Sequence, residues 1–226
     1  MLEVKQVTYQ YRTGADVVDA LRGVSAEFYP GTLYAIMGRS GSGKSTLLSL
    51  LAGMDLPLSG EILINGEVLS KLDRDKYRRE IVGMIFQSYY LLPHLTAAEN
   101  ISLAMELSGK YKGISKAERN NKIDSLLCSV GLTPSHGKKR ATRLSGGEQQ
   151  RIAIARTLGA DPEIILADEP TGNLDNENSA VIISILKKLA HDSGKCVIVV
   201  THSDTIAAEA DVVLHMADGR MENKRS

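Results

Sequence analysis

The 226-residue sequence lacks several features that define whole classes of protein. It carries no net charge, because 27 basic residues balance 27 acidic ones, so no overall electric field attracts nucleic acid or an anionic membrane. No apolar run approaches the ~18 residues that a membrane-spanning helix requires. Only two cysteines occur, Cys128 and Cys196, and neither has the neighbours of a metal site. We expect both to be buried, unpaired thiols in a reducing compartment.

Signals of secretion, repetition and low complexity are also missing. Residues Met1–Val7 alternate like a strand and lack the apolar core of a signal peptide. Hydrophobic residues make up 43% and charged residues 24% of the chain, as in ordinary globular proteins, and its length suits one large α/β domain or two small ones. We therefore expect a cytosolic protein that acts at a membrane only through a partner.

The most informative stretch of the chain is Gly38–Thr46, which reads GRSGSGKST. The apolar run Leu33–Met37 before it has the character of a buried strand, and Leu47–Ala52 after it favours a helix. A strand, a glycine-rich turn and a helix in this order form the phosphate-binding pattern G-x-x-x-x-G-K-[ST]. Glycines let backbone N–H groups approach phosphate oxygens, and the helix N-terminus adds unpaired donors. The pattern therefore predicts a nucleoside triphosphate site rather than a flexible, solvated turn.

The polar side chains of this loop have distinct expected roles. Lys44 is expected to neutralise the β- and γ-phosphates, and the Ser45 hydroxyl is expected to coordinate Mg²⁺. The loop residues predicted to contact the nucleotide are Gly38, Arg39, Ser40, Gly41, Ser42, Gly43, Lys44, Ser45 and Thr46.

Three stretches of the chain differ in their secondary-structure signals. Residues 1–87 read mainly as strands and include an Asn-Gly turn typical of a hairpin. Residues 88–159 read as helices, with capping-box patterns that begin at Thr96 and Ser115, and an α/β pattern returns over 160–226. We predict a single α/β domain with a P-loop core, made of a mainly parallel sheet and an antiparallel β subdomain. The stretch from about 88 to 159 is predicted to be an inserted α-helical subdomain.

A second motif, Leu144–Glu148 (LSGGE), precedes a helix rich in Gln and Arg. Here the chain resembles the ATP-binding-cassette (ABC) ATPases, whose signature is Leu-Ser-Gly-Gly-Gln/Glu. Taken alone, a Ser-Gly-Gly helix start is either a simple cap or an anion site. The resemblance implies a head-to-tail, ATP-dependent dimer of two copies of the chain. In that dimer Ser145, Gly146 and Gly147 contact the nucleotide of the opposite subunit.

The run Ile164–Ala167 is a predicted buried strand that ends in Asp168 and Glu169. Such a strand delivers its carboxylates to the C-terminal edge of a sheet, where doubly wound folds bind ligands. A pair of helix-capping acids is the alternative. The resemblance to ABC ATPases implies that Asp168 holds Mg²⁺ and that Glu169 is the general base for the attacking water.

Other residues match further motifs of the same family. Gln87 corresponds to the glutamine that approaches the metal and the attacking water, Asp175 lies in the loop that couples the two sites of the dimer, and His202 corresponds to the histidine that senses the γ-phosphate. Tyr11 resembles the aromatic residue that stacks on adenine. Tyr9 is a rival on the same strand, and a core position is an alternative for Tyr11.

The branch of the family is indicated by two stretches. Gly172–Asn173 stands where many importer ATPases carry Ser-Ala, and Leu91–Asn100 reads LLPHLTAAEN. Both resemble the MacB-like branch, which includes macrolide and peptide efflux, lipoprotein release, bacitracin-type antibiotic resistance and a cell-division pair that transports nothing. The resemblance implies that Gln87–Leu95 contacts an integral-membrane permease. The alternative is that these side chains pack inside the helical subdomain.

These features together predict the ATP-binding and ATP-hydrolysing subunit of a MacB-like exporter, which uses ATP and Mg²⁺. Through its permease it would lie at the cytoplasmic side of the plasma membrane. Three alternatives remain: an importer ATPase, a regulatory or mechanotransmission ATPase of a membrane partner, and a DNA-repair or ribosome-acting relative. The neutral charge argues against a nucleic-acid partner. Because the permease recognises the substrate in this architecture, the transported molecule is not encoded in this chain.

Overall fold

Short apolar runs form a six-stranded sheet at the centre of the computed structural model, which describes residues 1–14 and 16–222. Its strands are β3 (Leu33–Met37), β6 (Val82–Phe86), β7 (Ile164–Asp168), β8 (Cys196–Thr201), β9 (Val212–Ala217) and β10 (Arg220–Glu222). The order is β10-β9-β3-β8-β7-β6, parallel throughout except for β10, which runs antiparallel to β9. The carboxyl ends of β3, β7 and β8 therefore lie next to one another at one edge of the sheet.

The first part of the chain forms a second, antiparallel sheet. Its strands are β1 (Leu2–Thr13), β2 (Asp16–Phe28), β4 (Ser59–Ile64) and β5 (Glu67–Val68), in the order β2-β1-β4-β5. Asn65 and Gly66 join β4 to β5 with φ values of 50° and 86°, the left-handed values that this tight turn needs. The predicted combination of a mainly parallel sheet and an antiparallel β subdomain is thus present.

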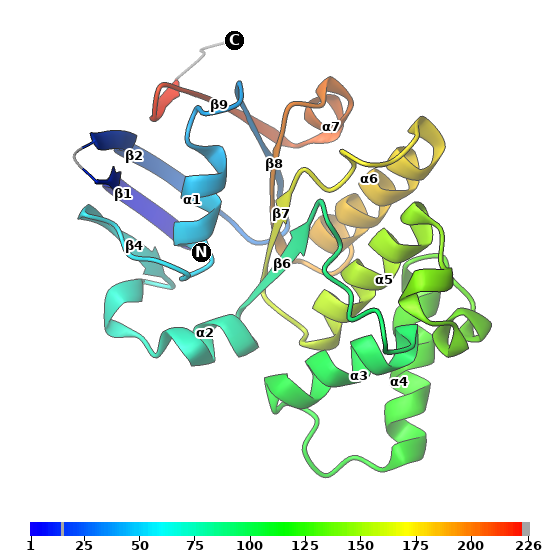
Figure 1. Ribbon diagram of the computed structural model, residues 1–226. Helices are drawn as coiled ribbons and strands as arrows, with labels where there is room; N and C mark the ends of the chain where they lie inside the picture. Colours follow the sequence, from blue (N-terminus) through cyan, green and yellow to red (C-terminus); the bar gives the residue numbers. More distant parts are fainter. Residues whose placement is uncertain (15, 223–226) are drawn as a thin grey trace.

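Helices cover both sheets in the described part of the chain. They are α1 (Lys44–Leu51), α2 (Arg74–Glu80), α3 (Ala97–Ser108), α4 (Lys116–Ser129), α5 (Gly146–Gly159), α6 (Asn176–His191) and α7 (Asp204–Glu209), with three 3₁₀ turns η1 (Leu69–Lys71), η2 (Pro134–Lys138) and η3 (Ala141–Arg143). Helix α1 lies between the two sheets, whereas α3, α4 and α5 group together on the other side of the molecule (Figure 1). None of the described helices is both long and apolar enough to cross a membrane.

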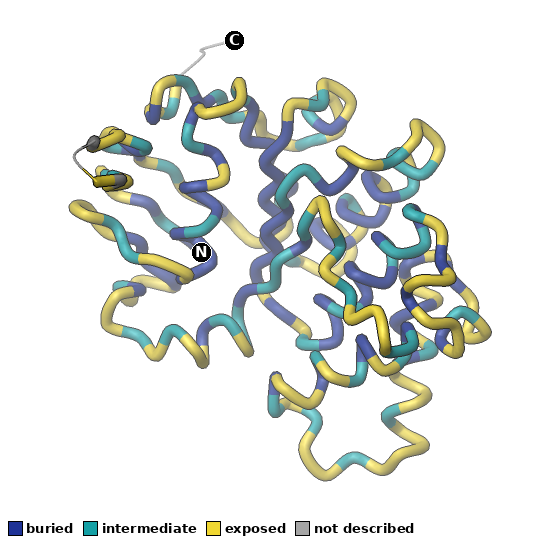
Figure 2. Tube along the Cα trace, in the orientation of Figure 1, coloured by how far each residue is buried: buried dark blue, intermediate teal, exposed yellow. Residues whose placement is uncertain are grey.

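Two apolar clusters fill the two faces of the six-stranded sheet, as the alternation along β3 illustrates. Leu33 and Ala35 belong to the cluster that includes residues of α3 to α7, and Tyr34 and Ile36 belong to the cluster shared with α1 and the antiparallel sheet. The central strands are buried along their length (Figure 2). Because apolar layers cover both faces, polar groups gather at the strand ends, where the site is built.

Both predicted capping boxes are present, at the first turns of α3 and α4. The Thr96 hydroxyl accepts from the Glu99 N–H at 3.2 Å, and the Glu99 carboxylate accepts from the Thr96 N–H at 2.7 Å. Ser115 and Glu118 make the same exchange. The sequence does not predict α2 or α7. Helix α2 (RDKYRRE) buries only Tyr77, and α7 has six residues, so neither shows the apolar periodicity of a longer helix.

The expectation that both cysteines are buried is wrong for one of them. Cys196 in β8 is buried, and burial raises the pKa of its thiol to about 12. Cys128 in α4 is exposed. The buried residues of α4 are Ile123, Leu126 and Leu127, and one further step of about 100° around the helix turns Cys128 towards solvent.

Candidate functional site

The phosphate loop connects β3 to α1, and two glycines shape its backbone. Gly43, at the cap of α1, has a φ of 102°, and a Cβ on it would lie 2.5 Å from the Ala20 carbonyl oxygen. A Cβ on Gly38 would lie 2.3 Å from the Met216 carbonyl oxygen. Only glycine fits at both positions, so the loop can turn tightly into the helix while its backbone lies close to neighbouring segments.

Lys44 lies almost fully buried inside this loop. Its ammonium group donates hydrogen bonds to the carbonyl oxygens of Gly38 at 2.7 Å and Arg39 at 3.0 Å. In the part of the chain that the structure describes, Lys44 forms no ion pair with a carboxylate. Its positive charge is therefore held within the loop by neutral carbonyl groups, in a position to pair with an anion such as phosphate.

A cleft of about 680 Å³ lies beside the loop, within the size range of small-molecule sites. Segments distant in the sequence line it. The lining residues are Tyr11, Val18, Asp19, Ala20, Gly38, Ser40, Gly41, Gly43, Lys44, Ser45, Thr46, Gln87, Asp168, Glu169 and His202. Two predicted loop residues, Arg39 and Ser42, instead line a neighbouring cavity of about 720 Å³. The fold therefore brings Tyr11, Gln87, Asp168, Glu169 and His202 to the phosphate loop.

Asp168 ends β7 opposite the start of α1. The Ser45 hydroxyl lies 3.5 Å from Asp168 Oδ1, which is long for a hydrogen bond. Burial and the adjacent charge of Glu169 raise the pKa of Asp168. A divalent cation would relieve this repulsion, and a hydroxyl with a carboxylate oxygen is a donor pair that suits Mg²⁺. Among the described residues, no three Asp, Glu, His or Cys side chains cluster as a metal site.

Glu169 is held by the end of β8 and the residue that follows it. Its Oε2 accepts from the Thr201 hydroxyl at 2.9 Å and from the His202 N–H at 3.4 Å, and its Oε1 lies 2.8 Å from His202 Nδ1. Because a carboxylate only accepts, this contact assigns a proton to Nδ1 and leaves Nε2 for another partner. The Glu169 side chain is 18% exposed and that of His202 75% exposed. The predicted base and the predicted phosphate-sensing histidine are therefore directly bonded.

Gln87 lines the cleft, but its side chain is engaged with the loop after Glu169. Its amide donates to Asn173 Oδ1 at 3.2 Å, and Asn173 Nδ2 donates to the Gln87 carbonyl oxygen at 3.1 Å. A Cβ on Gly172 would lie 2.7 Å from Gln87 Nε2, so any larger residue there would displace the Gln87 amide from this contact. The motifs assign Gly172 and Asn173 to a branch of the family and also place Asn173 in the predicted coupling loop with Asp175. They do not predict that these two residues hold Gln87.

The structure distinguishes the two candidate tyrosines. Tyr11 is 48% exposed, lines the cleft and has its hydroxyl 3.2 Å from Thr46 Oγ1. The Tyr9 hydroxyl donates to Asp55, and this bond raises the pKa of Tyr9 to about 12. The two rings contact edge to face with centroids 5.1 Å apart. Tyr11 therefore presents a ring to the cleft, backed by Tyr9.

The signature and the loop of Asp175 do not line the cleft of their own chain, as far as it is described. Ser145 caps α5, and Asp175 caps α6 by accepting from the Asn178 N–H at 2.8 Å. The two helix starts contact each other, because a Cβ on Gly147 would lie 2.1 Å from Asn178 Oδ1. Gly146 lies near Tyr89, whose hydroxyl would be 3.1 Å from an added Cβ. These residues form a second group, separate from the phosphate loop.

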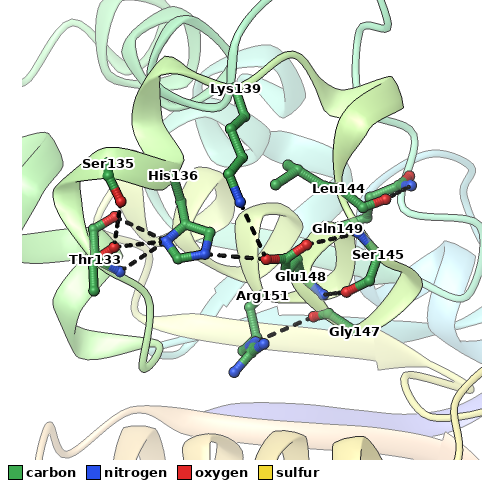
Figure 3. Close-up of polar contacts among 10 residues, drawn as sticks. All are labelled: Thr133, Ser135, His136, Lys139, Leu144, Ser145, Gly147, Glu148, Gln149 and Arg151. Atoms are coloured by element: carbon green, nitrogen blue, oxygen red, sulfur yellow. Dashed lines mark hydrogen bonds and ion pairs between the residues drawn. The ribbon is translucent and has the colours of Figure 1, made fainter.

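The first turn of α5 carries a third capping box and a polar cluster (Figure 3). Ser145 and Glu148 exchange hydrogen bonds, and Glu148 also contacts His136 and Lys139. The hydrogen bond from the Ser145 N–H makes the largest contribution to holding the pKa of Glu148 below its usual range. The Ser145 hydroxyl, Lys139 and His136 contribute less. No sequence motif points to His136 or Lys139. The S-x-x-E spacing from Ser145 to Glu148 is the sequence signal from which this capping box could have been predicted.

The segment predicted to face a permease exposes large apolar side chains, including Tyr90 and Leu92. Tyr89 and Tyr90 have left-handed φ values of 57° and 47°, which are unusual for bulky residues. The Arg156 guanidinium in α5 donates to the carbonyl oxygens of both, at 2.9 Å for Tyr89. Helix α5 therefore supports this surface as well as carrying the signature.

Comparisons with known proteins find similar sequences and structures. Residues 21–172 match the family model of the ABC transporter. The macrolide export ATP-binding/permease protein MacB 1 of Yersinia pestis is 43% identical over 224 residues, 98% of this chain. The chain spans only 34% of the length of that relative. The lipoprotein-releasing system ATP-binding protein LolD 2 of Rhodopirellula baltica is 40% identical, covering 100% of this chain and 90% of the relative.

Solved structures give the same result. A dimeric structure of MJ0796, an ABC transporter cassette of Methanocaldococcus jannaschii, aligns with a TM-score of 0.90 and 39% identity over 100% of both chains. A second dimeric structure of MJ0796, in a post-hydrolysis state bound to ADP and Pi, aligns with the same TM-score and 38% identity, again over 100% of both chains.

Proposed function

The chain belongs to the ABC transporter family, and from this premise we propose that it binds and hydrolyses ATP to drive a separate membrane permease, as the ATPase subunit of a MacB-like exporter. The observation that carries the proposal is the arrangement of the cleft. The buried cation of Lys44 lies on one side and the bonded pair of Glu169 and His202 on the other, while the signature lies elsewhere on the chain.

ATP binding would use the groups that already converge on the cleft. The triphosphate would pair with Lys44 and with the free N–H groups at the start of α1. The exposed ring of Tyr11 would stack on adenine. Ser45 and Asp168 would hold Mg²⁺, which when bound neutralises phosphate charge.

Hydrolysis would use Glu169 as the general base. Its carboxylate would accept a proton from the attacking water, while Thr201 and His202 keep it oriented. The exposed Nε2 of His202 would face the γ-phosphate. Gln87 would help to position the water once the cleft is closed, and its bond to Asn173 links that movement to the loop of Asp175.

A second copy of the chain would complete each site. Ser145, Gly146 and Gly147 do not line the cleft of their own chain as the structure describes it, which supports a contact with the nucleotide of the partner subunit. The dimeric structures of MJ0796 support a closed dimer for this chain as well. In that dimer the N-terminus of α5 would contact the phosphate bound by the partner subunit.

The partner in the membrane would bind the apolar surface around Tyr90 and Leu92, at the cytoplasmic face. The helical stretch of about 88–159 would move with it as a subdomain. The export direction rests on the likeness to MacB and LolD. Because the chain spans a third of MacB, the activity of the whole relative is carried over here as a proposal only.

The test uses Glu169→Gln with Lys44→Ala as the matched control. We expect the wild-type chain to release phosphate from ATP, and both variants to lose nearly all of this activity. Glu169→Gln should still bind ATP and should run as a dimer in size-exclusion chromatography with light scattering, whereas Lys44→Ala should neither bind nor dimerise. A Glu169→Gln chain that turns over ATP at the wild-type rate would contradict the assignment of the base.

The same Glu169→Gln chain tests the partner. Affinity purification from detergent-solubilised membranes of the native host, with ATP, should recover a permease with few spans and a large extracytoplasmic domain. A many-span permease with a solute-binding protein would instead indicate an importer. Recovery without any membrane protein would refute the transport function.

A further inference from the structure

A polar cluster joins η2 and Lys139, the residue that follows it, to the first turn of α5, which carries the signature (Figure 3). We propose that His136 and Lys139 are positioning residues for ATP hydrolysis: they hold Glu148, and Glu148 holds Ser145 at the N-terminus of α5. This inference rests on the proposed function, in which Ser145 contacts the nucleotide of the partner subunit.

Glu148 and Ser145 are joined by two hydrogen bonds. Glu148 Oε2 accepts from the Ser145 N–H at 2.7 Å, and the Ser145 hydroxyl accepts from the Glu148 N–H at 3.2 Å. The position of the Ser145 hydroxyl therefore depends on where the Glu148 carboxylate lies. A shift of that carboxylate would move the group that has to meet a phosphate oxygen, and misplacement on the scale of 1 Å is costly in catalysis.

His136 binds the other oxygen of Glu148 through a defined ring nitrogen. Its Nδ1 lies 3.2 Å from the Thr133 backbone nitrogen, 2.8 Å from the Thr133 hydroxyl and 3.3 Å from the Thr133 carbonyl oxygen. Because a carboxylate only accepts, the contact of the other ring nitrogen with Glu148 assigns a proton to Nε2. Nε2 in turn lies 3.1 Å from Glu148 Oε1 and donates to it. Thr133 thus holds the ring in the orientation in which Nε2 faces Glu148.

Lys139 places a positive charge next to the Glu148 carboxylate. Its ammonium lies 3.7 Å from Glu148 Oε1, and the Glu148 side chain is 20% exposed. A free carboxylate at the start of α5 would repel the phosphate of an incoming nucleotide. The nearby ammonium compensates this charge, and the hydrogen bonds from Ser145 and His136 engage both carboxylate oxygens.

The segment that carries these residues is anchored. The Lys139 N–H donates to the His136 carbonyl oxygen at 3.0 Å, and the Lys139 carbonyl oxygen accepts from the Ala97 N–H at 2.9 Å, at the start of α3. Gly137, between them, is buried, and an added Cβ would lie 3.2 Å from Leu127. His136 and Lys139 therefore act from a packed part of the helical region, which is what a positioning role requires.

Two substitutions at His136 separate its two contacts. In His136→Asn the amide lies near the former Nδ1, so it can still bond Thr133 but cannot reach Glu148. In His136→Gln the amide nitrogen lies near the former Nε2 and can still donate to Glu148. Lys139→Met and Lys139→Arg form a second pair, in which only arginine keeps the charge.

The experiment measures ATP-dependent dimerisation and ATP hydrolysis, and it compares both with the affinity of the monomer for ATP. In the Glu169→Gln background we expect His136→Asn to raise the ATP concentration for half-maximal dimerisation about 10-fold, as for loss of one hydrogen bond to a charged group. In the otherwise wild-type chain it should lower kcat by a similar factor. His136→Gln and Lys139→Arg should stay within about twofold of their parents, and Lys139→Met should be impaired. ATP affinity at protein concentrations too low for dimers, and the unfolding midpoint, should not change.

Three results would overturn the inference. The first is a His136→Asn chain that dimerises like its parent. The second is equal impairment of His136→Asn and His136→Gln. The third is a loss of monomer ATP affinity or of stability in parallel with the defect, which would indicate a merely structural role. If the Glu169→Gln parent itself fails to dimerise with ATP, the proposed function fails, and the positioning role fails with it.

Discussion

Thr201 offers a single-group test of how Glu169, the proposed general base, is held. Its buried hydroxyl donates to Glu169 Oε2 at 2.9 Å and accepts from the Ser203 N–H at 3.1 Å. Thr201→Val keeps the shape of the side chain and removes the hydroxyl, so Glu169 keeps only its contacts with His202. A hydrogen bond to a charged group contributes about 1.5–3 kcal/mol. If the bond orients the base in the transition state, kcat for ATP should fall about 10- to 100-fold.

The assay is steady-state phosphate release at saturating ATP, with ATP affinity measured separately by titration of a fluorescent nucleotide. We expect affinity to stay near wild type, because Thr201 does not line the cleft. Thr201→Ser keeps the hydroxyl and is the control. The Ser203 N–H also loses its acceptor in Thr201→Val, at a cost of about 1–3 kcal/mol, so the unfolding midpoint is recorded alongside. A wild-type kcat in Thr201→Val would refute the role of this bond, as would equal losses in both variants.

Two other predictions concern Tyr11 and Asp168. Tyr11→Ala should weaken ATP binding about 10-fold in an equilibrium titration, since stacking on a base contributes ~1–3 kcal/mol. Tyr9→Phe loses only the bond to Asp55 and should bind ATP normally in the same titration. Equal losses of affinity in both variants would contradict the assignment of Tyr11. Burial and the charge of Glu169 raise the pKa of Asp168, so its ionised form is less favourable in the folded protein than in the unfolded chain, and its contribution to stability is lost as pH rises through the folded pKa. Asp168→Asn should therefore raise the unfolding midpoint of the nucleotide-free protein at pH 7 by ~2–4 °C. The gain should vanish well below the ordinary pKa of aspartate, about 3.9. Scanning fluorimetry at both pH values checks this, and an unchanged midpoint at pH 7 would contradict it.

The parts of the fold that the sequence predicts are those encoded by local pattern. The runs that became β3, β7 and β8 are apolar and short, and the helix starts at Thr96 and Ser115 are capping boxes that form within four residues. The sequence pattern does not predict helix α2, because its residues are mostly charged and only Tyr77 is buried. Its position is determined by its packing against the sheet. Cys128 is misjudged for a related reason, since residue type alone does not say which face of a helix it occupies.

Side-chain partners are the part of the site that the sequence could not supply. The motifs predict that Gln87 and Glu169 follow strands, but they do not predict the bonds of these residues to Asn173 and Thr201, which join segments far apart in the chain. The choice between Tyr11 and Tyr9 depends on where Asp55 lies, and β1 and β2 slip in register just after Tyr9. Such contacts follow from tertiary packing rather than from spacing.

The central claim is that each active site is shared between two chains, and Ser145→Arg tests it most directly. Ser145 lies outside the cleft of its own chain, so a bulky cation there should leave ATP binding by the single chain unchanged. Light scattering with ATP should find a dimer for the Glu169→Gln parent, which keeps Ser145. The double variant with Ser145→Arg should be monomeric at the same nucleotide occupancy. Loss of ATP binding by the Ser145→Arg monomer would mean that the signature serves its own chain. A Ser145→Arg protein that still dimerises with ATP would equally contradict a shared site.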